Sequence, residues 1–169
     1  LPGYQTFLAG LLGPGIPKLG YHSKDVMSRA LDRGLTAEGF VFDGAIAAYL
    51  LSPTDGSYDL EKLGLTYFSF QPAKAGDYLA EGAFGPLADP VGPAAALTSH
   101  CALIGALHGV LEKRLRELEM WDLYETIELP LCSVLAEMEA EGFLIDRGAL
   151  VSFGEMLTQR IDQAQSCIY

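Results

Sequence analysis

The first half of the chain alternates short extended apolar segments with amphipathic helical segments. "IPKLGY" and "GFVFD" are brief apolar runs bounded by glycine or proline, as is typical of strands. Between and after them, apolar residues recur three or four positions apart, as on one face of a helix. The pattern predicts strands over 16–21 and 39–43, helices over 4–13, 23–35 and 44–52, and a short helix after Ser57 or Asp59.

Polar residues at the ends of these segments suggest how the helices begin and stop. Ser23 is a candidate N-cap of the second helix, and Gly34 a candidate C-terminal stop. Asp43, directly after a buried strand, is expected to cap the helix that ends before Pro53.

The second half is helical. A glycine- and proline-rich stretch over 76–93 predicts an irregular loop, and helices follow over 94–119 and 122–141. Pro130 is expected either to kink the second of these helices or to restart it. Residues 142–146 form a brief extended link. Alternating strands and helices followed by helices alone predict an α/β portion and then the start of a different unit.

The last helix carries a continuous apolar row. Leu150, Phe153, Leu157, Ile161, Ala164 and Ile168 recur at spacings of 3, 4, 4, 3 and 4. The row still runs where the sequence stops, so we expect this helix to pack on something outside the sequence.

Composition and charge limit the possible functions. Of 169 residues, 50% are hydrophobic, enough for a sizeable core, and 11 basic against 22 acidic residues give a net charge of −11. Tight binding of nucleic acid requires phosphate neutralisation, so weak DNA binding is expected. The basic cluster at 112–118 is interleaved with glutamates and is typical of a solvated helix face.

The cysteines and the hydropathy suggest a cytosolic, membrane-free protein. The three cysteines are far apart and odd in number, which favours reduced thiols, and Cys132 is expected to be buried. No apolar run reaches the roughly 18–20 residues that span a bilayer.

Two stretches resemble bacterial family A DNA polymerases. "IPKLGYHSKDVMSRALDRGLTAEGFVFDGAIAAYLLSP" (16–53) is similar to the middle of their 3′–5′ exonuclease-type domain. "YETIELPLCSVLAEMEAEGFLIDRGAL" (124–150) is similar to the junction with the polymerase domain, with its E-x-I-E-x-P-L and E-x-x-G-x-x-[IV]-D patterns.

The resemblance implies a slice of a larger enzyme. The fold would be α/β: a partial, degenerate ribonuclease H-like domain (1–120), then the start of the polymerase domain (121–169), with long helices leading into the thumb. The parent would extend DNA primers using Mg²⁺. The partners would be the remaining palm, fingers and thumb, with DNA bound through the parent and no membrane contact.

The resemblance also allows the nuclease site to be checked. Such exonucleases hold two metals with an early D-x-E pair, an aspartate in a turn and an aspartate in a late Y-x-x-x-D helix. No acid occurs in residues 1–24, and Val26 aligns with the second metal ligand, while Asp25 aligns with an aromatic residue. His100 and Ala96 align with the late Asp and Tyr. No catalytic, cofactor-binding or metal-binding residue is therefore predicted in this chain, and Asp25 is interpreted as a first-turn helix acid.

Other chemistry-bearing residues have structural interpretations. His22, His100 and His108 lack the i, i+4 spacing of a zinc face. The acids Glu137, Glu139 and Glu141 are interpreted as a solvated helix face, and Trp121 as filling the joint between two helices. The chain contains neither a GxxxxGK[ST] nor a GxSxG motif.

Two alternatives stay open at this point. The chain could be an active metal-dependent exonuclease using Asp25 and Asp43. It could instead be an acidic, purely helical interaction domain, unrelated to polymerases, that binds a basic partner.

Overall fold

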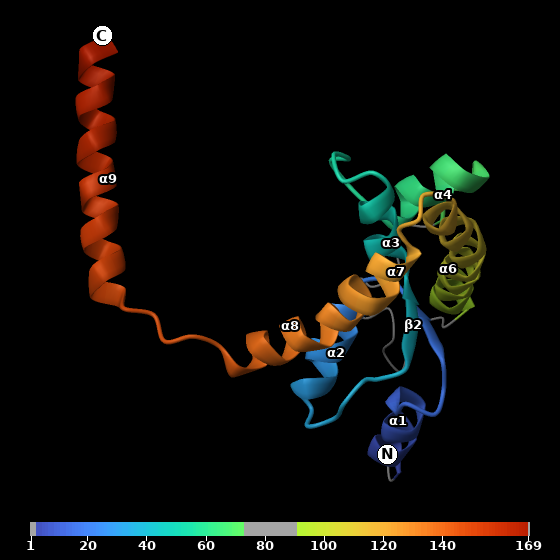
Figure 1. Ribbon diagram of the computed structural model, residues 1–169. Coiled ribbons are helices and arrows are strands. Elements are labelled where there is room, and N and C mark those ends of the chain that lie inside the picture. Colours follow the sequence, from blue (N-terminus) through green and yellow to red (C-terminus); the bar gives the residue numbers. More distant parts are fainter. Residues whose placement is uncertain (1–2, 73–90, 169) are drawn as a thin grey trace.

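The computed structural model describes residues 3–72 and 91–168, and shows a small helical α/β unit with one long helix extending from it (Figure 1). The described elements are α1 (Tyr4–Leu12), β1 (Lys18–Gly20), α2 (Ser23–Leu31), β2 (Phe40–Asp43), α3 (Gly44–Leu51), α4 (Leu60–Phe68), α6 (Val91–Glu117), α7 (Trp121–Leu123), the π-helical turn η1 (Tyr124–Glu128), α8 (Leu129–Glu141) and α9 (Arg147–Ile168).

Most predicted elements are confirmed to within a few residues. The expected loop at 76–93 falls largely outside the described residues. Its last three positions were predicted wrongly, because α6 already begins at Val91. Proline is tolerated in the first turn of a helix, where its missing N–H needs no partner, which accounts for Pro93 inside α6.

The strands β1 and β2 pair in parallel, with α2 between them in the sequence. Lys18 lies opposite Phe40, Leu19 opposite Phe42 and Gly20 opposite Asp43. The strand pair contradicts the alternative of a purely helical domain. The prediction of β2 as a buried strand is confirmed only in part, because Phe42 and Asp43 are buried but Val41 is 46% exposed.

The principal core lies where α6 crosses α3 and α4. Leu103, Leu107, Leu111 and Leu115 recur every four residues along one face of α6, and all four are buried. Phe42 reaches the same cluster from β2. The charged residues of 112–118 occupy the remaining faces, where Glu112 pairs with Arg116 and Lys113 with Glu117, as predicted for a solvated helix surface.

By length and composition, Gly92–Glu117 is apolar enough to cross a membrane, with a mean hydropathy of 1.5 over its most apolar window, and it is the one such helix in the described part of the chain. The expectation that no segment reaches this length was therefore wrong. Isolated Ser, Thr and His residues interrupt the apolar run, but they do not bring its mean hydropathy below that of a membrane-spanning helix. The core leucines supply part of that apolar character, and 17% of the window is buried in the described structure.

A second, smaller core joins α2 to α8. Met27, Ala30 and Ala37 pack against Cys132 and Ala136, so the predicted burial of Cys132 is confirmed. Residues 121–141 therefore pack on the α/β unit. The domain division at residue 121 stays a prediction.

Pro130 does not restart the second long helix, because the chain stays helical from Trp121 to Glu141. The Leu129 N–H donates to the Tyr124 carbonyl, five residues back, so η1 is one wide turn inside a continuous helix. The wide turn also corrects the phase of the helix. Tyr124, Leu129, Cys132 and Ala136 are all buried, yet their first spacing is 5, which a regular α-helix would place about 140° apart. One extra residue absorbed in η1 brings them to the same face.

The caps of α2 differ from the prediction. His22, in the left-handed region with φ of 55°, occupies the N-cap position, and its own side chain does not cap the helix. The Ser23 hydroxyl was unavailable as a cap because it is buried and bonded to Asp43. At the other end, Gly34 has φ of 67°, which confirms it as the left-handed stop.

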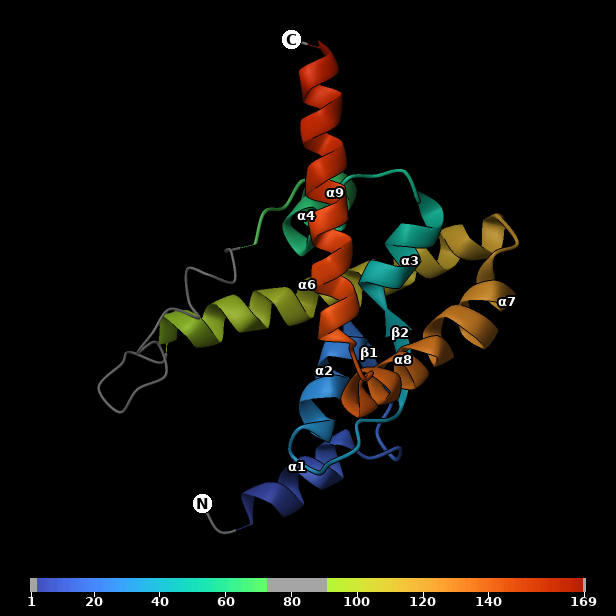
Figure 2. The same ribbon diagram turned by 90° about the vertical axis from the view of Figure 1, so that its left-hand side faces the viewer.

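Beyond Gly142 the chain leaves the packed unit. Residues 142–146 are extended as predicted, and the Asp146 carboxylate caps the start of α9 by accepting from the Ala149 N–H at 3.0 Å. Among the described residues of α9 none is buried, and the helix projects away from the rest of the chain (Figures 1 and 2).

The core of α6 gives a direct test of this packing. Leu107→Ala is expected to lower the free energy of unfolding by about 2–5 kcal/mol, because it leaves a cavity at a fully buried position. Leu97→Ala, on the same helix at a position 41% exposed, is the matched control and is expected to cost less than about 1 kcal/mol. Urea unfolding followed by circular dichroism measures both, and equal losses would contradict the assigned core.

Candidate functional site

The most highly connected polar group in the described structure is the Asp43 carboxylate. It lies at the end of β2 and is fully buried. Oδ1 accepts from the Ala45 and Ile46 N–H groups at 2.9 and 3.2 Å, which caps α3 as predicted. Oδ2 accepts from the N–H of Ser23 at 2.5 Å and from its hydroxyl at 2.6 Å. Four donors thus surround one carboxylate.

Tyr124 contacts the same residue from the distant junction segment. Its hydroxyl accepts from the Asp43 N–H at 2.6 Å and donates to the Asp43 carbonyl at 3.2 Å. Burial raises the pKa of the Tyr124 hydroxyl above its ordinary value, which keeps it protonated and able to donate. We call Ser23, Asp43 and Tyr124 the buried polar cluster.

The buried polar cluster suits a structural role. Every buried side-chain N or O atom in the described part of the chain has a hydrogen-bond partner. The Asp43 oxygens face N–H and O–H donors, whereas a divalent cation requires oxygen lone pairs that point at it. The fit of Asp43 to a metal site is therefore poor.

Asp25 and Val26 lie in the first turn of α2, and both are exposed. The position of Asp25 agrees with its interpretation as a first-turn helix acid. With Asp43 it borders a cavity of about 220 Å³ between α2 and α8, which Glu128 and Cys132 also line. Across the residues that the structure describes, no group of three or more His, Cys, Asp or Glu side chains could hold a metal ion.

Beside this cavity an ion pair joins α2 to α8. Lys24 Nζ donates to both oxygens of Glu139, at 2.6 and 2.8 Å, and this interaction raises the pKa of Lys24. Glu137, Glu139 and Glu141 are all exposed, as predicted. The ion pair between Glu139 and Lys24 was not predicted.

The three histidines lie in different environments. His22 contacts the Tyr21 ring edge-on, with centroids 4.5 Å apart. His108 lies between Phe42, at 4.8 Å between ring centroids, and the Glu112 carboxylate, at 3.1 Å. His100 is half-buried on α6, and neither it nor Ala96 lies in a cluster of metal-ligating side chains within the described ranges.

Trp121 fills the joint between α6 and α7 as predicted. The Arg116 guanidinium lies 4.3 Å from the centre of its ring, and Tyr124 packs on it at 5.2 Å. Its indole N–H donates to Glu125 at 3.0 Å.

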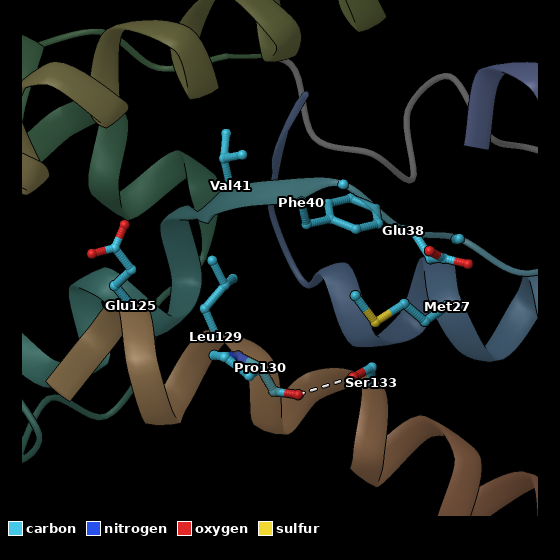
Figure 3. Close-up of a pocket in the computed structure, with 10 residues that line it drawn as sticks. Met27, Glu38, Phe40, Val41, Glu125, Leu129, Pro130 and Ser133 are labelled. Atoms are coloured by element: carbon cyan, nitrogen blue, oxygen red, sulfur yellow. Dashed lines mark hydrogen bonds between the residues drawn. The ribbon is translucent and has the colours of Figure 1, made fainter. Parts of the chain in front are cut away.

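A groove of about 360 Å³ separates residues 37–41 from η1 and α8 (Figure 3). Apolar side chains, among them Met27, Phe40 and Leu129, line it, and Glu38 and Glu125 also border it. The Ser133 hydroxyl donates to the Pro130 carbonyl of its own helix. The groove therefore offers no paired nucleophile and base.

The sequence of the chain was compared with those of known proteins. No model of a protein family matches the chain. DNA polymerase I of Geobacillus stearothermophilus is 29% identical over 164 residues, covering 96% of this chain and 19% of that protein. DNA polymerase I of Bacillus caldotenax is 32% identical over 139 residues, covering 81% and 16%, and that of Chloroflexus aurantiacus is 31% identical over 164 residues, covering 92% and 17%. The chain belongs to the DNA polymerase I family.

A solved structure agrees with this assignment. The polymerase domain of Pol1 from M. smegmatis, in complex with DNA primer-template and dNTP, aligns with a TM-score of 0.75 and 26% identity. The alignment covers 100% of this chain and 27% of that one. The chain thus spans less than a fifth of the length of these curated DNA polymerase I relatives, and the alternative of a domain unrelated to polymerases is excluded.

Sequence reasoning missed two members of the buried polar cluster. Ser23 was assigned to the wrong partner, and Tyr124 was given no role. Both belong to the stretches that carry the family resemblance, and Tyr124 is the first residue of the junction motif. The place of Tyr124 in this motif was the one indication in the sequence that it has a role. Its partner Asp43 lies 81 residues away, so residue spacing could not predict the hydrogen bond between them.

The cluster can be tested through Tyr124. Tyr124→Phe keeps the ring but removes the acceptor of the buried Asp43 N–H, so the free energy of unfolding is expected to fall by about 1–3 kcal/mol. Tyr4→Phe, at a position 56% exposed, is the matched control, with an expected change within about 0.5 kcal/mol. Chemical unfolding monitored by fluorescence compares them. Indistinguishable stabilities of Tyr124→Phe and the parent sequence would refute the structural role of this hydroxyl.

Proposed function

We propose that the chain is a non-catalytic structural segment of a DNA-directed DNA polymerase. Residues 1–120 would form part of a ribonuclease H-like 3′–5′ exonuclease-type domain whose nuclease site is inactivated. Residues 121–169 would begin the polymerase domain. The parent enzyme would extend DNA primers from a template with Mg²⁺ in the cytoplasm, using catalytic groups outside this chain. The family membership established above supports this proposal.

The burial and hydrogen bonding of the Asp43 carboxylate are the main support for the proposal that the nuclease site is inactive. Asp43 is the one carboxylate near the aligned metal position that is fully buried, and four donors already surround its two oxygens. Binding a cation there would require breaking the cap of α3 and the bond to Ser23. The aligned metal-ligand position itself holds Val26, a hydrocarbon side chain. The residues present do not fit a two-metal centre.

The charge of the chain supports a bracing role away from the DNA. A net charge of −11 opposes contact with phosphates, so DNA would be held through the rest of the parent. The partner of this segment would be the remaining polymerase chain, which the exposed apolar row of α9 could contact. No membrane is involved in this proposal.

An active exonuclease remains the second candidate because Asp25 and Asp43 border one cavity. We expect the purified chain to release no nucleotides from a 5′-labelled single strand with Mg²⁺ or Mn²⁺, measured on denaturing gels. An intact DNA polymerase I exonuclease serves as positive control. Metal-dependent release that Asp25→Asn and Asp43→Asn each abolish would overturn the inactivated site.

The proposal that the chain is a segment of a longer polymerase can be tested in the source cells. An antibody raised against this chain is expected to detect a band several times larger than 18.2 kDa, because the relatives are more than five times longer. A predominant band at the size of the chain alone would contradict its role as a segment of a polymerase.

A further inference from the structure

The Lys18 side chain, at the start of β1, binds three backbone carbonyl oxygens. Its Nζ donates to the carbonyls of Gly13, Ile16 and Glu38, each at 2.7 Å. A lysine ammonium group has three N–H donors, so these bonds use all of them. Gly13 ends α1, Ile16 lies in the turn that follows, and Glu38 lies just before β2. We call the three carbonyl oxygens the oxygen cage.

The backbone around the cage is shaped so that its oxygens converge. Gly39 has φ of 74°, and a Cβ added there would lie 2.8 Å from the Ile16 carbonyl oxygen and 3.2 Å from Lys18 Nζ. Glycine at this position therefore lets the segment before β2 approach the turn after α1 closely. The Gly13 carbonyl lies at the C-terminal end of α1, where the helix dipole favours a cation.

The cage lies where the strand pair is irregular. The register of β1 and β2 shifts directly after Lys18, and such an irregularity disrupts the ladder of backbone bonds locally. Two backbone bonds flank the cage: the Lys18 N–H donates to the Gly39 carbonyl, and the Glu38 N–H donates to the Leu12 carbonyl, both at 2.8 Å. The exchange rates of these two amide hydrogens therefore report whether the cage is closed.

Another lysine of the chain makes a different set of contacts. Lys62 Nζ donates to one carbonyl, that of Ser57, at 3.0 Å, and pairs with the Asp55 carboxylate at 3.3 Å. Among the residues that the structure describes, no carboxylate lies within ion-pair distance of Lys18. The charge of Lys18 is thus balanced by carbonyl dipoles from three backbone positions.

From this geometry we infer that Lys18 is a built-in cation that latches the end of α1 to the start of β2, and that the oxygen cage is specific for a primary ammonium ion. A shortened side chain at this position turns the cage into a binding site for a small primary alkylammonium ion. The ligand needs several N–H donors on one compact nitrogen, which the flat guanidinium of arginine does not provide. The inference does not depend on the proposed function.

Chemical rescue of Lys18→Ala tests the latch. The substitution removes the atoms of n-propylammonium from the side chain, and amide exchange at residue 18 and Glu38 is expected to accelerate at least about tenfold, because the charge-assisted bonds are lost. Added n-propylammonium is expected to restore most of the protection, as measured by NMR. Tetramethylammonium, which has the same charge but no N–H donor, is expected to restore none. Equal effects of the two ions, or no effect of either, would overturn the cage.

Two variants serve as controls for the rescue. Lys18→Met keeps a hydrocarbon chain in place of the lysine stem, so it is expected to lose the same protection and not to be rescued by n-propylammonium. Rescue of Lys18→Met would mean that the ion acts elsewhere on the chain and would contradict binding in the cage. Lys62→Ala removes the other lysine and is expected to leave exchange at Lys18 and Glu38 unchanged.

Competitive acetylation tests the latch on the unaltered chain, so it does not require any variant to fold. The chain is treated with a limiting amount of an N-hydroxysuccinimide ester of acetic acid, and the modified peptides are quantified by mass spectrometry. Lys18 is expected to react at least about fivefold more slowly than Lys62, because its nitrogen has to leave three hydrogen bonds before it can attack the ester. Equal rates at the two lysines would overturn the latch.

Discussion

The arrangement of the α/β unit depends on one buried carboxylate. Asp43 ends β2, begins α3 and holds the start of α2 through Ser23, while its own backbone is bound by Tyr124. Removing such a group from water is unfavourable unless all its lone pairs find donors. The elements that supply those donors therefore have to meet at one point. This requirement fixes the relative position of two segments 81 residues apart.

The wide turn η1 is the complementary constraint on the junction side. Tyr124 must face Asp43, while Leu129, Cys132 and Ala136 must face α2 and the cores. A regular α-helix cannot satisfy both demands with these spacings. The π-helical turn does so at the position where Pro130, lacking an N–H, already prevents a regular bonding ladder. The π-helical turn therefore lets Tyr124, before it, and Leu129, Cys132 and Ala136, after it, face the same side of the helix.

Local patterns predicted most of the fold but little of the polar cluster. Hydrophobic period and capping chemistry located the strands, the helices and the Asp43 cap, because each depends on residues a few positions apart. Ser23 was misassigned because its hydroxyl satisfies a distant carboxylate instead of its own helix. The Lys24–Glu139 pair spans 115 residues, and no spacing rule reaches that far. The wide turn was missed because a proline is compatible with a kink, a restart or a π-turn.

The isolation of α9 has a mechanical consequence. Its 22 residues form a rod about 33 Å long that is joined to the packed unit only through the five-residue link. Such a rod acts as a lever arm. A rotation of about 10° at the base of α9 moves its far end by about 6 Å, so small changes in the backbone angles of the link are amplified into displacements comparable to the pitch of a helix. The accuracy with which α9 is positioned is then set at its base and by whatever it contacts along its length.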